Sequence, residues 1–160
     1  MKKFNIAWLR AVALALALVI CLAGLCACGG SSDNEGSVTV VVASGGVENE
    51  YTVDLADLEI TEGALTVLKY LEQTEGIEVV MKDGIYGAYL TKVGIAEADD
   101  ATGAYVAIYT SVASDFDVSA YAKTIDYKGT SLTTSGLGIS SMSVKDGAVI
   151  YICEEVYSFS

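Results

Sequence analysis

Glu62-Gly63-Ala64-Leu65-Thr66-Val67-Leu68-Lys69-Tyr70-Leu71, residues 62–71, is the one segment of this chain with a clear helical pattern. The apolar residues that recur at the spacing of one helix face are Ala64, Leu65, Leu68 and Leu71, with Val67 at its edge. We expect Thr61 to cap the helix and Gly76 to end it. A helix with a single apolar face packs against a sheet.

Strand patterns lie on both sides of this helix. Before it, the β-branched run Val38–Val42 and the alternating run Tyr51–Leu55 flank a Ser44-Gly45-Gly46 turn, which predicts an opening hairpin. After it we expect strands over 77–81, 86–91, 104–110, around a Lys128-Gly129 turn, and over 148–157. Turns are expected at Asp83-Gly84 and Asp146-Gly147, and an irregular excursion over 111–123. The pattern therefore predicts a β-rich α+β domain, with one amphipathic helix packed on an antiparallel or mixed sheet in a β-grasp-like arrangement.

The first thirty residues have the pattern of an export signal. Lys2, Lys3 and Arg10 precede an apolar run from Ala11 to Leu25, and Leu25-Cys26-Ala27-Cys28 follows. A basic start, an apolar middle and small residues before a cut are typical of a secretory signal. The final four residues resemble the lipobox of bacterial lipoproteins. That resemblance implies cleavage before Cys28, lipid on the Cys28 thiol, and a chain anchored in the membrane on its extracytoplasmic face, in the cell envelope.

Two alternatives stay open for this segment. An uncleaved membrane helix is one, because residues 6–25 approach the ~20 residues that span a bilayer. Cys26 is a competing lipid site, although Leu25 before it is large. On the lipoprotein interpretation, 1–27 is the signal peptide, 28–36 a Gly- and Ser-containing flexible tether, and 37–157 the domain.

Composition excludes several functional classes. From Cys28 onward, six basic residues accompany 21 acidic ones, a net charge of −15 that disfavours nucleic-acid binding. The chain has no histidine, so the commonest general base and metal ligand is missing. Cys153 is the single cysteine of the domain, in an apolar strand pattern that favours a buried, inert thiol.

Three stretches resemble a known family in their order and spacing. They are the helix entry 62–71, the segment Tyr86-Gly87-Ala88-Tyr89-Leu90-Thr91-Lys92-Val93-Gly94-Ile95-Ala96, and the closing segment Val144-Lys145-Asp146-Gly147-Ala148-Val149-Ile150-Tyr151. Together they make residues 37–157 similar to a family of bacterial secreted domains of unknown function that resembles the C-terminal β-domain of transcobalamin and intrinsic factor. Where that family has a tryptophan, this chain has Tyr105 or Tyr109.

The resemblance implies a ligand-side surface on these strands. The residues it selects as candidate ligand contacts are Tyr86, Gly87, Tyr89, Tyr105 and Tyr109. A tyrosine offers a flat apolar face and a polar tip, which suits a planar ligand, and a corrinoid is the ligand that the family suggests. Tyrosines also favour strands for packing alone, so a structural role is the alternative.

The remaining polar clusters favour surface roles over chemistry. Asp99-Asp100 and Asp115-x-Asp117 lack the pattern of a calcium loop, and a solvated loop is the preferred interpretation. Glu154 and Glu155 are strand neighbours and point to opposite faces, so they cannot form an acid–base pair. The serines and threonines of residues 130–143 have no histidine to activate them.

We therefore expect a non-catalytic binding module for a small molecule, without a resident metal or cofactor. Its partners would be the membrane, through the lipid on Cys28, and a small-molecule ligand or an envelope protein. A module for adhesion or for contact with a protein or glycan is the main alternative, and a hydrolase is the third.

Overall fold

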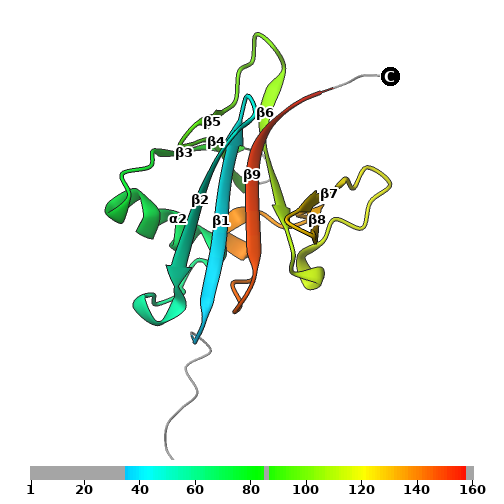
Figure 1. Cartoon of the computed structure of the whole chain (residues 1–160). Coiled ribbons are helices and arrows are strands. Elements are labelled where there is room, and N and C mark those ends of the chain that lie inside the picture. Colours follow the sequence, from blue (N-terminus) through cyan, green and yellow to red (C-terminus); the bar gives the residue numbers. More distant parts are fainter. Residues whose placement is uncertain (1–34, 85–86, 158–160) are drawn as a thin grey trace, which may run out of the picture. The chain divides into compact units, whose positions relative to one another are not determined.

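The computed structural model describes residues 35–84 and 87–157, and it confirms the β-rich α+β class with one helix and two sheets (Figure 1). The elements are β1 (Ser37–Ser44), β2 (Val47–Asp54), α2 (Gly63–Thr74), β3 (Val79–Gly84), β4 (Gly87–Val93), β5 (Ala96–Glu97), β6 (Ala104–Thr110), β7 (Thr124–Tyr127), β8 (Thr130–Thr134) and β9 (Val149–Val156). Short 3-10 turns lie at Leu55–Asp57, Ala113–Asp115 and Ile139–Ser141.

The larger sheet has six strands in the order β2-β1-β9-β6-β8-β7. Its only parallel pair in the described chain is β1 with β9, and the other neighbours are antiparallel. The predicted opening hairpin is confirmed, with Gly45 and Gly46 at φ +58° and +83° in a two-residue turn. Positive φ at both turn positions matches the twist of the two strands and favours glycine. The more specific β-grasp likeness stays a prediction.

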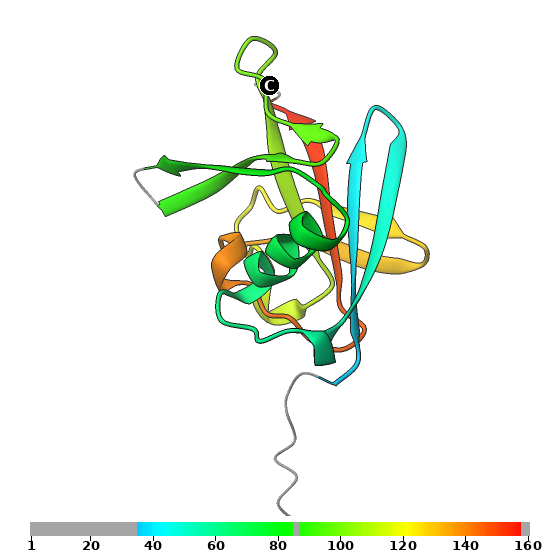
Figure 2. The same ribbon diagram turned by 90° about the vertical axis from the view of Figure 1, so that its left-hand side faces the viewer.

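The helix and the smaller sheet cover one face of the larger sheet, and the β7–β8 hairpin lies toward the other (Figure 2). The smaller sheet has the order β3-β4-β5. On β1, Val38, Val40 and Val42 face α2, whereas Val41 faces the hairpin side. Both faces of β1 are thus covered, which explains why its sequence is apolar at successive positions.

The start of α2 differs from the prediction. Thr61 does not cap the helix: the Thr66 hydroxyl accepts the backbone N–H groups of Thr61 (3.3 Å) and Glu62 (3.0 Å) instead. Gly63 has φ +50°, and a Cβ there would lie 2.5 Å from the Met142 carbonyl oxygen. The helix therefore begins at a close backbone contact rather than at a side-chain cap. Its predicted end is confirmed, because Thr74 is the last helical residue before Gly76.

Two further turn predictions have different outcomes. Asp83 and Gly84 were expected to form a turn, but both belong to β3, because pairing with β4 continues as far as Gly84 opposite Gly87. The Lys128-Gly129 turn is confirmed: it joins β7 to β8, and both residues have positive φ.

The two hydrophobic clusters of the domain, and the pairing partner of each described strand, lie within residues 35–157. This part of the chain therefore has a hydrophobic core of its own. The predicted signal 1–27 and the lipid site Cys28 lie outside the described residues. Within the described ranges, the structure contains no helix of the length and apolarity that crossing a membrane requires.

Candidate functional site

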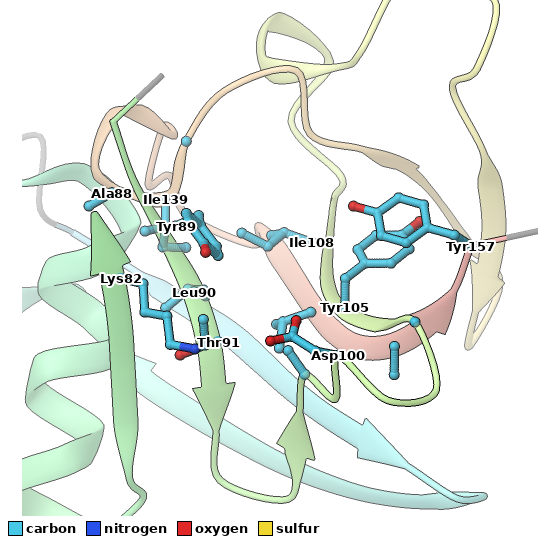
Figure 3. Close-up of a pocket in the computed structure, with 15 residues that line it drawn as sticks. Lys82, Ala88, Tyr89, Leu90, Thr91, Asp100, Tyr105, Ile108, Ile139 and Tyr157 are labelled. Atoms are coloured by element: carbon cyan, nitrogen blue, oxygen red, sulfur yellow. The ribbon is translucent and has the colours of Figure 1, made fainter. Parts of the chain in front are cut away.

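A groove of about 580 Å³ lies between β4 and β6, and we call it the β4–β6 groove (Figure 3). Its lining residues are Lys82, Ala88, Tyr89, Leu90, Thr91, Ala98, Asp100, Gly103, Ala104, Tyr105, Val106, Ile108, Gly138, Ile139 and Tyr157. Most of these side chains are apolar or aromatic, and few are charged. This size and composition are typical of small-molecule sites.

The wall on the β4 side is formed where the strand changes register. Ala88–Leu90 pair with β3 in one register and Lys92–Val93 in another, because the pairing is irregular between Val80 and Met81. Leu90 is buried in the main core, whereas Tyr89 is 53% exposed and points toward the groove (Figure 3). Such a bulge commonly redirects side chains beside a binding site.

The wall on the β6 side combines a side-chain surface with a strand edge. Val106 and Ile108 pack against the main core and line the groove. Tyr105 contributes to the rim, and its ring stacks on that of Tyr157 with centroids 4.3 Å apart. The alternation predicted for this strand is confirmed, because Tyr105, Ala107 and Tyr109 pack in the other cluster.

Three polar side chains border the groove. The Thr91 hydroxyl donates to the Val80 carbonyl oxygen (3.3 Å), so it is occupied by the backbone. Lys82 and Asp100 are exposed, and in the described part of the chain neither side chain forms a hydrogen bond or an ion pair. The groove therefore presents one ammonium and one carboxylate that are free to meet a ligand.

The predicted contact residues are only partly brought together. Tyr89 and Tyr105 line the groove, and Gly87 begins β4 beside it. Tyr109 does not line it: the side chain is 1% exposed and lies in the cluster beneath the β7–β8 hairpin. Tyr86 lies outside the described residues. Lys82 and Asp100 were not selected from the sequence, because no local pattern shows that a β3 residue and a residue of the β5–β6 turn meet at one groove.

Tyr109 belongs to a hydrogen-bond network around Glu155. The hydroxyls of Tyr105 (2.6 Å) and Tyr109 and the ammonium of Lys123 all donate to the Glu155 carboxylate. Burial opposes ionisation of Glu155, but the bonds from Lys123, Tyr105 and Tyr109 outweigh it and hold its pKa below the usual range. Burial, together with the Glu155 charge, raises the pKa of Tyr109.

Similar tyrosine–carboxylate pairs join the β7–β8 hairpin and β9 to β2. Tyr127 and Lys128 both donate to Glu50, and Tyr151 donates to Glu48 (2.7 Å). These bonds give the tyrosines of this face a structural role, which the sequence left as the alternative. Glu154 points to the opposite face from Glu155 and accepts the Glu97 backbone N–H (2.9 Å), as alternation predicts.

Asp115 corrects the prediction of a solvated acidic loop. Its side chain is 2% exposed and accepts hydrogen bonds from the Ser143 backbone N–H (2.5 Å), the Ser143 hydroxyl (2.9 Å) and the Ser114 hydroxyl (2.9 Å). The carboxylate therefore fastens two loops together. Among the described residues, no cluster of three histidine, cysteine, aspartate or glutamate side chains has the geometry to hold a metal ion.

Comparisons with known proteins show the fold of this domain. No protein-family model matches the sequence, and no curated protein is similar enough to it in sequence to count as a relative. A crystal structure of a protein from Ruminococcus gnavus ATCC 29149, provisionally described as metal binding, matches with a TM-score of 0.50 and 19% identity, over 78% of this chain and 100% of that one.

Haptocorrin, a transcobalamin-family protein solved in complex with Cbi, also matches with a TM-score of 0.50. Identity is 17%, and the match covers 77% of this chain but only 25% of haptocorrin. This chain thus spans about a quarter of that protein's length. At such identities the likeness shows a shared fold, in agreement with the transcobalamin-like resemblance of residues 37–157.

Proposed function

We propose that this chain is a non-catalytic binding module that takes a small molecule into the β4–β6 groove. The observation that carries the proposal is the groove itself, about 580 Å³ of space with an apolar floor and two unpaired charged groups at its border. An apolar floor supplies affinity by removing ligand surface from water, and a few polar groups set orientation. The Thr91 hydroxyl at the groove is bonded to the Val80 carbonyl oxygen, so it is not free to attack a ligand, which supports a binding role.

A corrinoid is the first ligand to test. Haptocorrin was solved in complex with Cbi, and the fold shared with it is what supports this choice. Tyr89 offers an exposed flat ring at the groove for a planar ligand. The strand order β2-β1-β9-β6, with β1 parallel to β9 and a helix after β2, supports the β-grasp-like arrangement predicted from the sequence. The metal binding attributed to the R. gnavus protein has no matching side-chain cluster in the described residues.

The direct test is a titration followed by nuclear magnetic resonance. The ¹⁵N-labelled chain from Cys28 onward is titrated with cobalamin and then with a library of small organic fragments. We expect shifts concentrated in the backbone amides of Ala88–Thr91 and Tyr105–Ile108. Ala88→Trp, which fills the groove from an exposed strand position, should abolish them, whereas Ala56→Trp, at an exposed position away from it, should not. Binders that shift only amides elsewhere, or a library without a single binder, would refute the proposal.

Anchoring through lipid on Cys28 is a second part of the proposal. The supporting observation is the Leu25-Cys26-Ala27-Cys28 sequence after an apolar run. A diacylglyceryl group supplies two acyl chains, which is enough for stable membrane attachment on the extracytoplasmic face. Intact-mass spectrometry of the native protein tests this. A mass that includes Met1, or an unmodified thiol at position 28, would contradict it.

Contact with an envelope protein is a second candidate function, favoured by one exposed loop. Val118 is 96% exposed and Tyr121 is 87% exposed, although both are large and apolar or aromatic. Exposed aromatic side chains are enriched where proteins meet. Crosslinking on intact cells, with the Val118→Ser/Tyr121→Ser variant as control, tests this function. A crosslinked partner lost in that variant supports it, and recovery of monomer alone would refute it.

A further inference from the structure

One edge of β6 is open where it borders the groove. On the side of β9, β6 is paired from Ala104 to Thr110. On the other side, Asp99 bridges to Ala104, and β8 pairs only with Tyr109 and Thr110. The Ser135 backbone N–H reaches the Ile108 carbonyl oxygen (2.8 Å). In the described chain, residues 105–107 therefore have no strand partner on this side.

The facing strand is open over a comparable stretch. Ala88–Leu90 pair with β3 on one side, whereas β5 pairs only with Lys92 and Val93. The Thr91 carbonyl oxygen accepts the Ala98 backbone N–H (2.8 Å), which closes one end of the gap. The β4–β6 groove thus lies between the open edge of β4 and the open edge of β6. Residues 96–99 connect the two edges at one end of the groove. Open edges carry peptide groups that take up an extended chain.

Charge places a second constraint on the occupant. Six lysines lie in the described residues. Lys69, Lys92, Lys123 and Lys128 form ion pairs with glutamates there, whereas Lys82 and Lys145 form none, and of these two only Lys82 lines the groove. The Asp100 side chain likewise has no partner there. Figure 3 shows Lys82 beside Thr91 and Asp100 beside Tyr105, so the two charged groups border the groove from opposite sides. A single cation at the groove of an acidic domain disfavours a polyanion, and a purely apolar ligand would leave the edge peptide groups dehydrated and unpaired.

We propose that the β4–β6 groove binds a short extended peptide with free termini, and this inference rests on the binding function proposed above. The peptide's amides pair with the open edge at residues 105–107, its ammonium meets Asp100, and its carboxylate meets Lys82. A three-residue edge is about 10 Å long, which a tripeptide matches. Its central side chain lies over the apolar floor formed by Leu90 and Ile108.

The test uses isothermal titration of the chain from Cys28 onward with the tripeptide Ala-Leu-Ala. Acetylation of its N-terminus, amidation of its C-terminus and N-methylation of the leucine amide remove one proposed contact each. We expect each change to weaken binding about fivefold or more. Asp100→Asn should make the chain indifferent to N-terminal acetylation, and Lys82→Met should make it indifferent to C-terminal amidation. Glu59→Gln and Lys145→Met, exposed charge changes outside the groove, should leave all four affinities unchanged.

Each result decides a separate question. Absence of tripeptide binding, while fragments or cobalamin still shift the groove amides, would overturn the peptide inference and leave the binding function standing. Equal affinity for all four peptides would overturn it as well. Absence of every ligand from the groove would overturn both proposals. Circular dichroism checks that the variants are folded, which we expect because the Lys82 and Asp100 side chains are exposed and form no bond in the described residues.

Discussion

The substitution Tyr109→Phe should destabilise the domain by about 1.5 kcal/mol, at the lower end of the range for a hydrogen bond to a charged group. The phenyl ring fits the same buried site, because Tyr109 is 1% exposed and only its hydroxyl is removed. That hydroxyl donates to Glu155, which keeps two other donors, Tyr105 and Lys123. The carboxylate is therefore weakened but not left unpaired, which limits the loss.

Tyr151→Phe is the matched control. The Tyr151 hydroxyl also donates to a carboxylate, that of Glu48, but Glu48 is exposed, so water replaces the lost donor. We expect a loss below about 0.5 kcal/mol. The free energy of unfolding of each variant is measured by urea denaturation monitored by circular dichroism, with an unchanged denaturant slope as the check that the unfolded state is the same.

A double-mutant cycle with Glu155→Gln isolates the Tyr109–Glu155 interaction. The structure predicts a coupling free energy of about 1 kcal/mol or more between these two side chains. If Tyr109→Phe is no more destabilising than Tyr151→Phe, or if the coupling is absent, then the hydrogen-bond network around Glu155 does not stabilise the face of the larger sheet toward the β7–β8 hairpin, and our reasoning is wrong.

Three further predictions concern titratable groups. The pKa of Glu155 is lowered by folding, so its stabilisation is present above about pH 4.5 and is lost as pH falls through the folded-state pKa; the stability gap between wild type and Glu155→Gln should shrink between pH 6 and pH 3, and a constant gap would contradict this. Asp115→Ala should cost about 3 kcal/mol in urea denaturation because three buried bonds are lost, against less than about 1 kcal/mol for Asp117→Ala; similar losses would refute the buried role. Burial raises the pKa of the Cys153 thiol to about 11, so in a Cys28→Ser chain begun at residue 28 about one thiol in a thousand is ionised at pH 8, and labelling by Ellman's reagent should be far slower than for free cysteine; equally fast labelling would show that the thiol is not buried.

Local sequence patterns predicted those elements whose conformation depends mainly on neighbouring residues. Two glycines in the first hairpin and Lys128-Gly129 in the last have the positive φ that their sequences suggest. The apolar face of α2 is the face that packs, because helical spacing alone fixes which side chains lie together. The prediction of a turn at Asp83-Gly84 was wrong. The position at which a hairpin reverses depends on the register of its two strands, and the whole strand pair determines that register.

The candidate site depends on contacts between residues far apart in the sequence, which local patterns do not predict. Alternation placed Tyr105 and Tyr109 on one side of β6, but it cannot say what covers that side. The β7–β8 hairpin lies there, so Tyr109 became part of a core instead of a ligand surface. The Asp115–Ser143 bonds join positions 28 residues apart, and the groove joins β4 to β6 through their open edges. Such long-range arrangements follow from the fold as a whole.

A crystal structure of the chain from Cys28 onward, grown with the tightest binder from the cobalamin and fragment titrations, tests the central claim most directly. We predict electron density for that molecule between Leu90 and Ile108, within reach of Lys82 and Asp100. Density for the molecule at another surface, with only water between β4 and β6, would contradict the claim that this groove is the binding site.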